Sequence, residues 1–197
     1  MCSTDGGTTF TQLGEPYGKF TSHETKFIEL ANGNILLNIR ATTGQTYWMK
    51  SENCGETWSI KTSGTTETSG NSGGKHADFT RYEFNGRDIK VGGEKYALSV
   101  IKKRLDGYNV RMTFNDFNDG KGGFKSKYLH NKDFATNVVG GDGYPAITVL
   151  PDGTIATLTE EIEGIVFRRF NLSWLSSSDG IEDGEDFVDY EVDNITK

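Results

Sequence analysis

The chain has 197 residues and a net charge of −7 at pH 7, with 25 glycines, 3 prolines and 12% aromatic residues. This acidity argues against nucleic acid and against an anionic membrane surface as partners, and no apolar run approaches the roughly 20 residues of a transmembrane helix. Abundant glycine without long helical periodicity is typical of an all-β, turn-rich domain. The two cysteines, Cys2 and Cys54, lie in no zinc-binding spacing, so we expect no metal and no cofactor, and their disulfide state stays open.

An eight-residue pattern, Ser-x-Asp-x-Gly-x-Thr-aromatic, opens the chain and recurs 48 residues later. It reads STDGGTTF at residues 3–10 and SENCGETW, with Asn for Asp, at residues 51–58. Residues 115–124, NDFNDGKGGF, resemble a worn third copy in which extra residues break the register. Two copies at the spacing of a propeller blade predict a β-propeller.

The chemistry of this pattern is that of a tight hairpin turn. We expect Asp5 or Asn53 to accept hydrogen bonds from backbone amides two residues on, and the glycine to supply a positive φ. The final aromatic residue, Phe10 or Trp58, is expected to anchor the turn in the core. The pattern is therefore structural and has no catalytic role.

Alternating apolar residues and Asx-Gly turns predict antiparallel strands grouped into about three four-stranded blades after one trailing strand. We expect this partial propeller to occupy residues 1–175, followed by an acidic tail or linker over 176–197. The expected strands are 22–30, 34–41, 45–50 and 57–62, then 77–84, 95–101, 108–115 and 125–130, and finally 144–150, 153–160 and 163–172.

Two of these hairpins share the pattern Leu-x-Asx-Gly-x-Ile, and every element of the second lies 120 positions after its counterpart. Residues equally far from the turn face each other in an antiparallel hairpin, so Glu24 should oppose Arg40 and Tyr144 should oppose Glu160. Each pairing also has an ordinary interpretation, as a surface ion pair or as packing. If the hairpins are equivalent units around one axis, however, the four groups converge at one end of it.

These features together resemble the sialidase (neuraminidase) superfamily, whose Asp boxes match the eight-residue repeats. The similarity is to the second half of a bacterial-type exo-α-sialidase domain and covers most of the chain from Phe20 to Leu175. It implies the antiparallel four-stranded blades of a six-bladed propeller. The matching segments are HETKFIELANGNILLNIR, the repeat at Ser51, ADFTRYEF, and GYPAITVLPDGTIATLTEE running into FNLSWL.

The resemblance implies a role for each of the four residues. Tyr144 matches the nucleophile, Glu24 the base that pairs with it, Arg40 one of three arginines that clamp the sialic acid carboxylate, and Glu160 the residue that orients another of them. A neutral phenol avoids repulsion by that carboxylate, but its pKa of about 10 requires an adjacent base. We therefore expect Tyr144 within hydrogen-bond reach of Glu24, the Arg40 guanidinium free to bind a carboxylate, and Glu160 close by without its arginine.

The chain departs from the family pattern in two places. Gly107 aligns where the next clamp arginine belongs, and Arg104, three residues earlier, replaces it only if the segment between them loops out. The first clamp arginine and the Asp general acid come from early blades that this sequence does not contain, and six blades need about 350 residues. We therefore expect the isolated chain to be inactive and to need the N-terminal half of the propeller or a partner chain.

The segment at His76 and Asp78 follows a Gly/Ser/Thr-rich loop and matches a pocket wall of the family, although entry into a strand is the plainer interpretation. The resemblance also implies a secreted, periplasmic or cell-surface bacterial protein. Three functions follow: an exo-α-sialidase acting on sialylated glycans, a non-catalytic carbohydrate-binding propeller, or a related glycosidase acting on another acidic sugar. The Tyr144–Glu24 pair favours the first.

Overall fold

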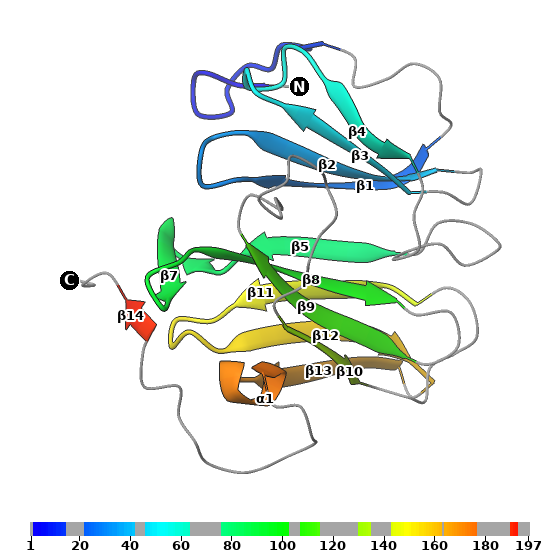
Figure 1. Cartoon of the computed structure of the whole chain (residues 1–197). Coiled ribbons are helices and arrows are strands. Elements are labelled where there is room, and N and C mark those ends of the chain that lie inside the picture. The colour runs from blue at the N-terminus through cyan, green and yellow to red at the C-terminus, as the bar shows by residue number, and fades with distance from the viewer. Residues whose placement is uncertain are drawn as a thin grey trace. The chain divides into compact units, whose positions relative to one another are not determined.

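The computed structural model of the chain describes residues 2–14, 22–41, 46–63, 76–102, 107–114, 130–134, 143–162, 164–176 and 190–192. These residues fall into two compact units, Met1–Gly74 (unit 1) and Lys75–Lys197 (unit 2). Their secondary structure is antiparallel β-sheet with one short helix, which confirms the predicted fold class (Figure 1). Within these ranges no helix is long and apolar enough to cross a membrane.

Unit 1 contains one four-stranded sheet in which each strand pairs with the next along the chain. Its first hairpin closes with the Leu30 amide bonded to the Asn34 carbonyl (2.8 Å) and the Gly33 amide bonded to the Leu30 carbonyl (2.9 Å). The hairpin 120 positions later closes with the same two bonds at 2.8 and 2.9 Å, so the predicted equivalence of the two turns is confirmed. The strands are β1 (Ser22–Glu29), β2 (Ile35–Ala41), β3 (Thr46–Ser51) and β4 (Ser59–Ser63), close to the four predicted.

The two eight-residue repeats form the same hydrogen-bonded turn. Ser3 Oγ donates to Asp5 Oδ1 (2.7 Å) and accepts the Gly7 amide (2.7 Å), while Asp5 Oδ1 accepts the Thr9 amide (2.9 Å). The second copy repeats these bonds at 3.0, 2.8 and 2.9 Å, with Asn53 in the place of Asp5. The Asx side chain thus reaches four residues on, not the two expected, because the serine hydroxyl takes the amides nearer to it.

The glycines of the repeats, Gly7 and Gly55, have φ values of +90° and +94° as predicted, but the two aromatic residues differ. Trp58 packs against the core of unit 1, whereas Phe10 is 60% exposed, so the expected core anchor is wrong for Phe10. The second turn joins β3 to β4, whereas the described chain around the first is paired only by the bridge between Cys2 and Thr11. The core of unit 1 is formed by Leu37, Ile39, Ala41, Tyr47 and Met49.

Unit 2 contains two larger sheets and a small one. The four-stranded sheet has the order β10-β9-β8-β5, the next has the order β11-β12-β13, and the small one has the order β14-β7-β6. A short helix, α1 (Leu172–Ser176), packs against β10 (Figure 1). The strands are β5 (Ala77–Arg81), β6 (Glu83–Phe84), β7 (Arg87–Val91), β8 (Tyr96–Lys102), β9 (Tyr108–Phe114), β10 (His130–Phe134), β11 (Pro145–Val149), β12 (Ile155–Glu161), β13 (Gly164–Phe170) and β14 (Tyr190–Val192).

The core of unit 2 forms where one face of the β5–β8–β9–β10 sheet meets one face of the β11–β12–β13 sheet. Strand alternation brings Leu98 and Val100 of β8 against Ile147 and Val149 of β11, and all four are buried in one cluster. The Tyr82 hydroxyl ties the sheets further by donating to the Gly153 carbonyl (2.6 Å). The other members of the cluster are Ile89, Tyr96, Tyr108, Val110, Met112, Phe134, Ile155, Leu172 and Leu175.

Three features of unit 2 differ from the predicted strands. Residues 125–129 of the strand expected at 125–130 lie outside the described residues, and β10 (His130–Phe134) begins at the last residue of that expected strand. The segment expected as one strand at 77–84 is broken at Tyr82 into β5 and β6, and β6 forms a hairpin with β7 in the connection that follows. Within the predicted tail, Tyr190–Val192 pair with β7. The sequence signal for the missed hairpin is Asn85-Gly86, whose φ values of +51° and +75° belong to a two-residue turn.

Candidate active site

In unit 1, Glu24 and Arg40 lie at the end of the sheet away from the repeat turn at residues 51–58. Arg40 Nη1 is 3.0 Å from Glu24 Oε2, so the predicted cross-strand juxtaposition is confirmed. Register along β1 shifts between Ser22 and Thr25, which makes the pairing irregular where Glu24 stands. The expectation of a guanidinium free for a ligand is wrong at Nη1, because the facing carboxylate is within hydrogen-bond distance.

In unit 2, Tyr144 immediately precedes β11 and lies opposite Glu160 on β12. The Glu160 amide donates to the Tyr144 carbonyl (3.1 Å), which confirms the predicted pairing. The Tyr144 amide in turn donates to Glu160 Oε2 (3.3 Å). Among the residues that the structure describes, the Glu160 carboxylate pairs with no arginine. Tyr144 itself is 44% exposed, a large aromatic side chain held at the surface of the sheet.

The two pocket-wall candidates have different surroundings. Asp78 Oδ2 accepts the Ile147 amide (2.9 Å), so this carboxylate covers a backbone donor at the edge strand β11. His76 is buried, at 8% exposure, and its ring centroid lies 3.9 Å from that of Tyr144 with the planes at 49°. His76 therefore contacts the candidate nucleophile, whereas Asp78 joins two sheets.

Tyr108, which the sequence interpretation did not single out, supports the backbone at Tyr144. Its hydroxyl donates to the Glu160 carbonyl (2.7 Å). Burial, and then the negative charges of Glu160 and Glu161, raise the pKa of Tyr108 to about 12, so this hydroxyl stays a donor at neutral pH. A Cβ on Gly143 would come within 2.2 Å of the same oxygen, so this position accepts only glycine without rearrangement.

Two cationic residues complete the surroundings of Tyr108. Lys102 is 2% exposed, and its Nζ lies 5.1 Å from the centre of the Tyr108 ring. Arg168 binds Glu161 through both guanidinium ends, with Nη2 2.9 Å from Oε2. The hydrogen bonds from Arg168 hold the pKa of Glu161 below its usual value. These contacts form within the β8–β9 and β12–β13 hairpins, and the Tyr108–Glu160 hydrogen bond joins the two hairpins across 52 residues of sequence.

Two parts of the predicted site stay predictions. Tyr144 and Glu24 belong to different units, and Arg104 lies outside the described residues. Gly107, which aligns with the missing clamp arginine, is buried and directly precedes β9.

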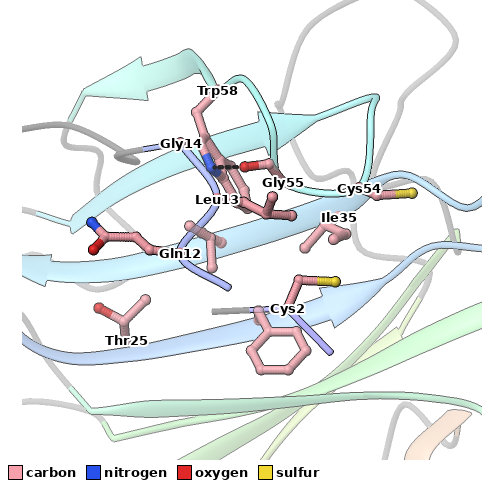
Figure 2. Close-up of a pocket in the computed structure, with 11 residues that line it drawn as sticks. Cys2, Gln12, Leu13, Gly14, Thr25, Ile35, Cys54, Gly55 and Trp58 are labelled. Carbon is pink, nitrogen blue, oxygen red and sulfur yellow. Dashed lines mark hydrogen bonds between the residues drawn. The ribbon is translucent and has the colours of Figure 1, made fainter. Parts of the chain in front are cut away.

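A pocket of about 530 Å³ lies elsewhere in unit 1, between residues 12–14 and the sheet (Figure 2). Its walls include Thr25, Leu37 and Trp58, and both cysteines line it as free thiols. Because side chains alternate along a strand, Thr25 faces away from Glu24, and the pocket is on the other face of the sheet from the Glu24–Arg40 pair. It is not the predicted site.

No protein-family model matches the sequence, and comparison with curated proteins finds no match. Solved structures do match. The intramolecular trans-sialidase from Ruminococcus gnavus, in complex with oseltamivir carboxylate, has 22% identity and a TM-score of 0.69 over 90% of this chain and 38% of its own. The NanB sialidase from Streptococcus pneumoniae has 21% identity and a TM-score of 0.65 over 87% and 27%.

The leech intramolecular trans-sialidase, complexed with 2,7-anhydro-Neu5Ac, has 16% identity and a TM-score of 0.64 over 88% of this chain and 27% of its own. At these identities the likeness concerns the fold. This chain spans between about a quarter and two fifths of the length of the structures it matches. Its antiparallel sheets therefore have the fold of part of a sialidase β-propeller.

Proposed function

We propose that the chain carries part of the active site of a retaining exo-α-sialidase, with Tyr144 as nucleophile and Glu24 as its base. The observation that carries the proposal is the surface position of Tyr144 at the open end of a hairpin whose turn is equivalent to the one that pairs Glu24 with Arg40. A binding protein has no need of a tyrosine and a glutamate at equivalent ends of two hairpins. The sialidase-like fold supports the same proposal.

The proposed reaction uses the phenol because the anomeric carbon of a sialic acid carries a carboxylate. Glu24 accepts the phenolic proton as the Tyr144 oxygen bonds to that carbon and the glycosidic bond breaks. The leaving oxygen needs a proton from a general acid, a role that we assign to no residue of this chain. Arg40 binds the sialic acid carboxylate through its guanidinium. To do so, the guanidinium gives up part of its contact with the Glu24 carboxylate and contacts the substrate carboxylate instead.

We further propose that turnover requires additional sheets of the same propeller, from an N-terminal half or from a partner chain. The outer face of the β11–β12–β13 sheet supports this, because strand alternation gathers Leu158, Ile165 and Phe167 there, and Ile165 is 73% exposed. Sheet faces of this kind are normally covered by a packed layer. The complete protein is thus the proposed enzyme, and the isolated chain should not hydrolyse a 4-methylumbelliferyl sialoside.

A mechanism-based label tests Tyr144 without the general acid. In 2,3-difluorosialic acid the leaving group is fluoride, which departs without protonation, while the 3-fluoro group slows hydrolysis of the product. We expect incubation with the chain to add one 3-fluorosialosyl group to Tyr144, located by peptide mass mapping. Tyr144→Phe should abolish the label, and Arg40→Met should slow it on the order of 10- to 100-fold, while Arg169→Met, at an exposed ion pair, should leave it unchanged.

A non-catalytic carbohydrate-binding propeller is the second candidate, and the contact of Arg40 Nη1 with Glu24 favours it. This alternative predicts that sialic acid perturbs the amide resonances of the chain but that difluorosialic acid adds no mass. Equal labelling of wild-type chain and Tyr144→Phe would contradict Tyr144 as the nucleophile.

A further inference from the structure

His76 is the buried partner of an exposed side chain. It precedes β5, and its carbonyl accepts the Lys102 amide at the end of β8 (3.0 Å), so its backbone is fixed by the sheet. The ring is 8% exposed, whereas Tyr144, 3.9 Å away between ring centroids, is 44% exposed. The imidazole thus forms an inner wall on which the phenol ring rests.

The charged and titratable groups on the elements around His76 are already engaged. Asp78, on β5, accepts the Ile147 amide, and Glu161, on β12, is bound by Arg168 of β13. Lys102 of β8 lies over the Tyr108 ring of β9, and the Glu160 carboxylate of β12 accepts the Tyr144 amide.

Carboxylates, lysine and arginine keep their charge between pH 5 and 8, which is the window in which histidine changes its own. Among the described neighbours of Tyr144, His76 is therefore the side chain of the type that can change charge in this window. A change of charge 3.9 Å from a phenol ring alters both its electrostatic environment and its contact geometry.

We propose that His76 is a positioning residue for Tyr144, fixing the tilt of the phenol ring and linking it to the protonation of the imidazole. The inference rests on the proposed function, because orienting the Tyr144 ring serves catalysis only if Tyr144 is the nucleophile. An imidazolium beside the phenol favours the phenolate needed for attack, and a neutral imidazole does not.

Nuclear magnetic resonance of the chain labelled with ¹³C-tyrosine tests this link without any sialoside. Tyr144→Phe identifies the Tyr144 ring resonances by their loss. In the wild-type chain we expect these resonances to move with an inflection between pH 5 and 8. His76→Phe keeps a flat ring of similar size but cannot titrate, so the inflection should be lost. The sequence has two other histidines, and His23→Gln and His130→Gln should each leave it in place.

Two results would overturn the proposal: Tyr144 resonances that do not depend on pH over this range, or an inflection that survives in His76→Phe. If circular dichroism shows that His76→Phe does not fold, His76→Gln serves as the second non-titrating variant, with the same expected loss. The difluorosialic acid label and this titration fail independently. If Tyr144 is labelled but its resonances show no inflection, Tyr144 remains the proposed nucleophile and the positioning role of His76 is rejected. If the resonances show the inflection but Tyr144 is not labelled, only the sialidase proposal is rejected.

Discussion

At the residue scale, the position of Tyr144 depends on a neighbour that has no side chain. Gly143 brings its backbone so close to the Tyr108 hydroxyl that a Cβ would lie 2.2 Å from that oxygen. The same hydroxyl donates to the Glu160 carbonyl, opposite Tyr144. One buried phenol therefore contacts the chain at the start of β11 and at the end of β12, the two places that carry Tyr144 and Glu160.

A double-mutant cycle on Gly143 and Tyr108 measures this packing. Gly143→Ala should lower the free energy of unfolding by about 1–3 kcal/mol, because the new methyl group must displace the hydroxyl or the backbone. Tyr108→Phe should cost about 1 kcal/mol for the lost hydrogen bond. In the Tyr108→Phe background Gly143→Ala should cost less, since its closest obstacle is gone.

Urea denaturation followed by tryptophan fluorescence gives the three values. If the free-energy costs of Gly143→Ala and Tyr108→Phe are strictly additive, the close approach of Gly143 to the Tyr108 hydroxyl is contradicted. Gly153→Ala, in the β11–β12 turn where the nearest atoms are 3.6 Å or more from the added Cβ, measures a different cost, that of a side chain at a positive φ, which Gly143 does not have.

The sequence predicted the positions of the candidate site residues better than it predicted the residues that pack against them. Tyr144 opposite Glu160, and Glu24 opposite Arg40, follow from the turn centres alone, because antiparallel register is a local property. The tilted ring contact of His76 with Tyr144, and the contact of Tyr108 with Gly143, depend on how two sheets pack. Such contacts join residues of remote sequence position, and no periodicity in a single sequence reports them.

At the element scale, hairpins were predictable where turn chemistry fixes the backbone. The Asx-Gly turns of residues 30–34 and 150–154 formed as expected, and the two eight-residue repeats formed matching turns, because their hydrogen bonds lie within the turn itself. β10 continues to Phe134, beyond the strand expected at 125–130, of which residues 125–129 lie outside the described part of the chain. The hairpin of β6 and β7 was missed although Asn85-Gly86 marks it, because β7 lies between the strands expected at 77–84 and 95–101, where the four-stranded blade pattern has no strand.

The β12–β13 pair carries a salt bridge whose effect on stability depends on pH. Hydrogen bonds from Arg168 lower the pKa of Glu161 in the folded chain. The unfolded state therefore binds more protons as pH falls, so the stabilisation is fully present above about pH 4.5, the ordinary value for Glu, and is lost as pH drops through the lower folded value.

Arg168→Met should therefore destabilise the chain by about 1–3 kcal/mol at pH 7 and flatten the fall in stability below pH 4.5. Arg169→Met is the matched control, because its partner Asp152 is half-exposed and such pairs contribute about 0–1 kcal/mol. Denaturation midpoints measured from pH 7 to pH 3 give the pH dependence of stability for Arg168→Met and for Arg169→Met. If the two variants lose stability in parallel with wild type as pH falls, the Glu161–Arg168 pair is not the source of the dependence.

At the scale of the whole molecule, the candidate chemistry is divided between two compact units. Glu24 and Arg40 belong to the first, whereas His76, Tyr144 and Glu160 belong to the second. Equivalent turns 120 positions apart predict that the two hairpins hold equivalent places around one axis. The proposed base and the proposed nucleophile thus belong to different units, and their pairing stays a prediction.

The proposed pairing of Tyr144 with Glu24 can be tested through the side-chain carboxyl carbon of Glu24. If the Tyr144 hydroxyl donates to Glu24, at the usual oxygen–oxygen distance of about 2.5–3.0 Å, Tyr144→Phe removes one hydrogen bond from that carboxylate and shifts its ¹³C resonance. Tyr96→Phe, a buried tyrosine of the same unit, should leave the resonance in place, and Glu29, on the other face of β1, should not respond to either change. If the Glu24 resonance is identical in wild type and Tyr144→Phe, Glu24 does not accept a hydrogen bond from Tyr144 and is not its base. The Glu24–Arg40 contact would then be an ordinary cross-strand ion pair, and Tyr144 would need another base to act.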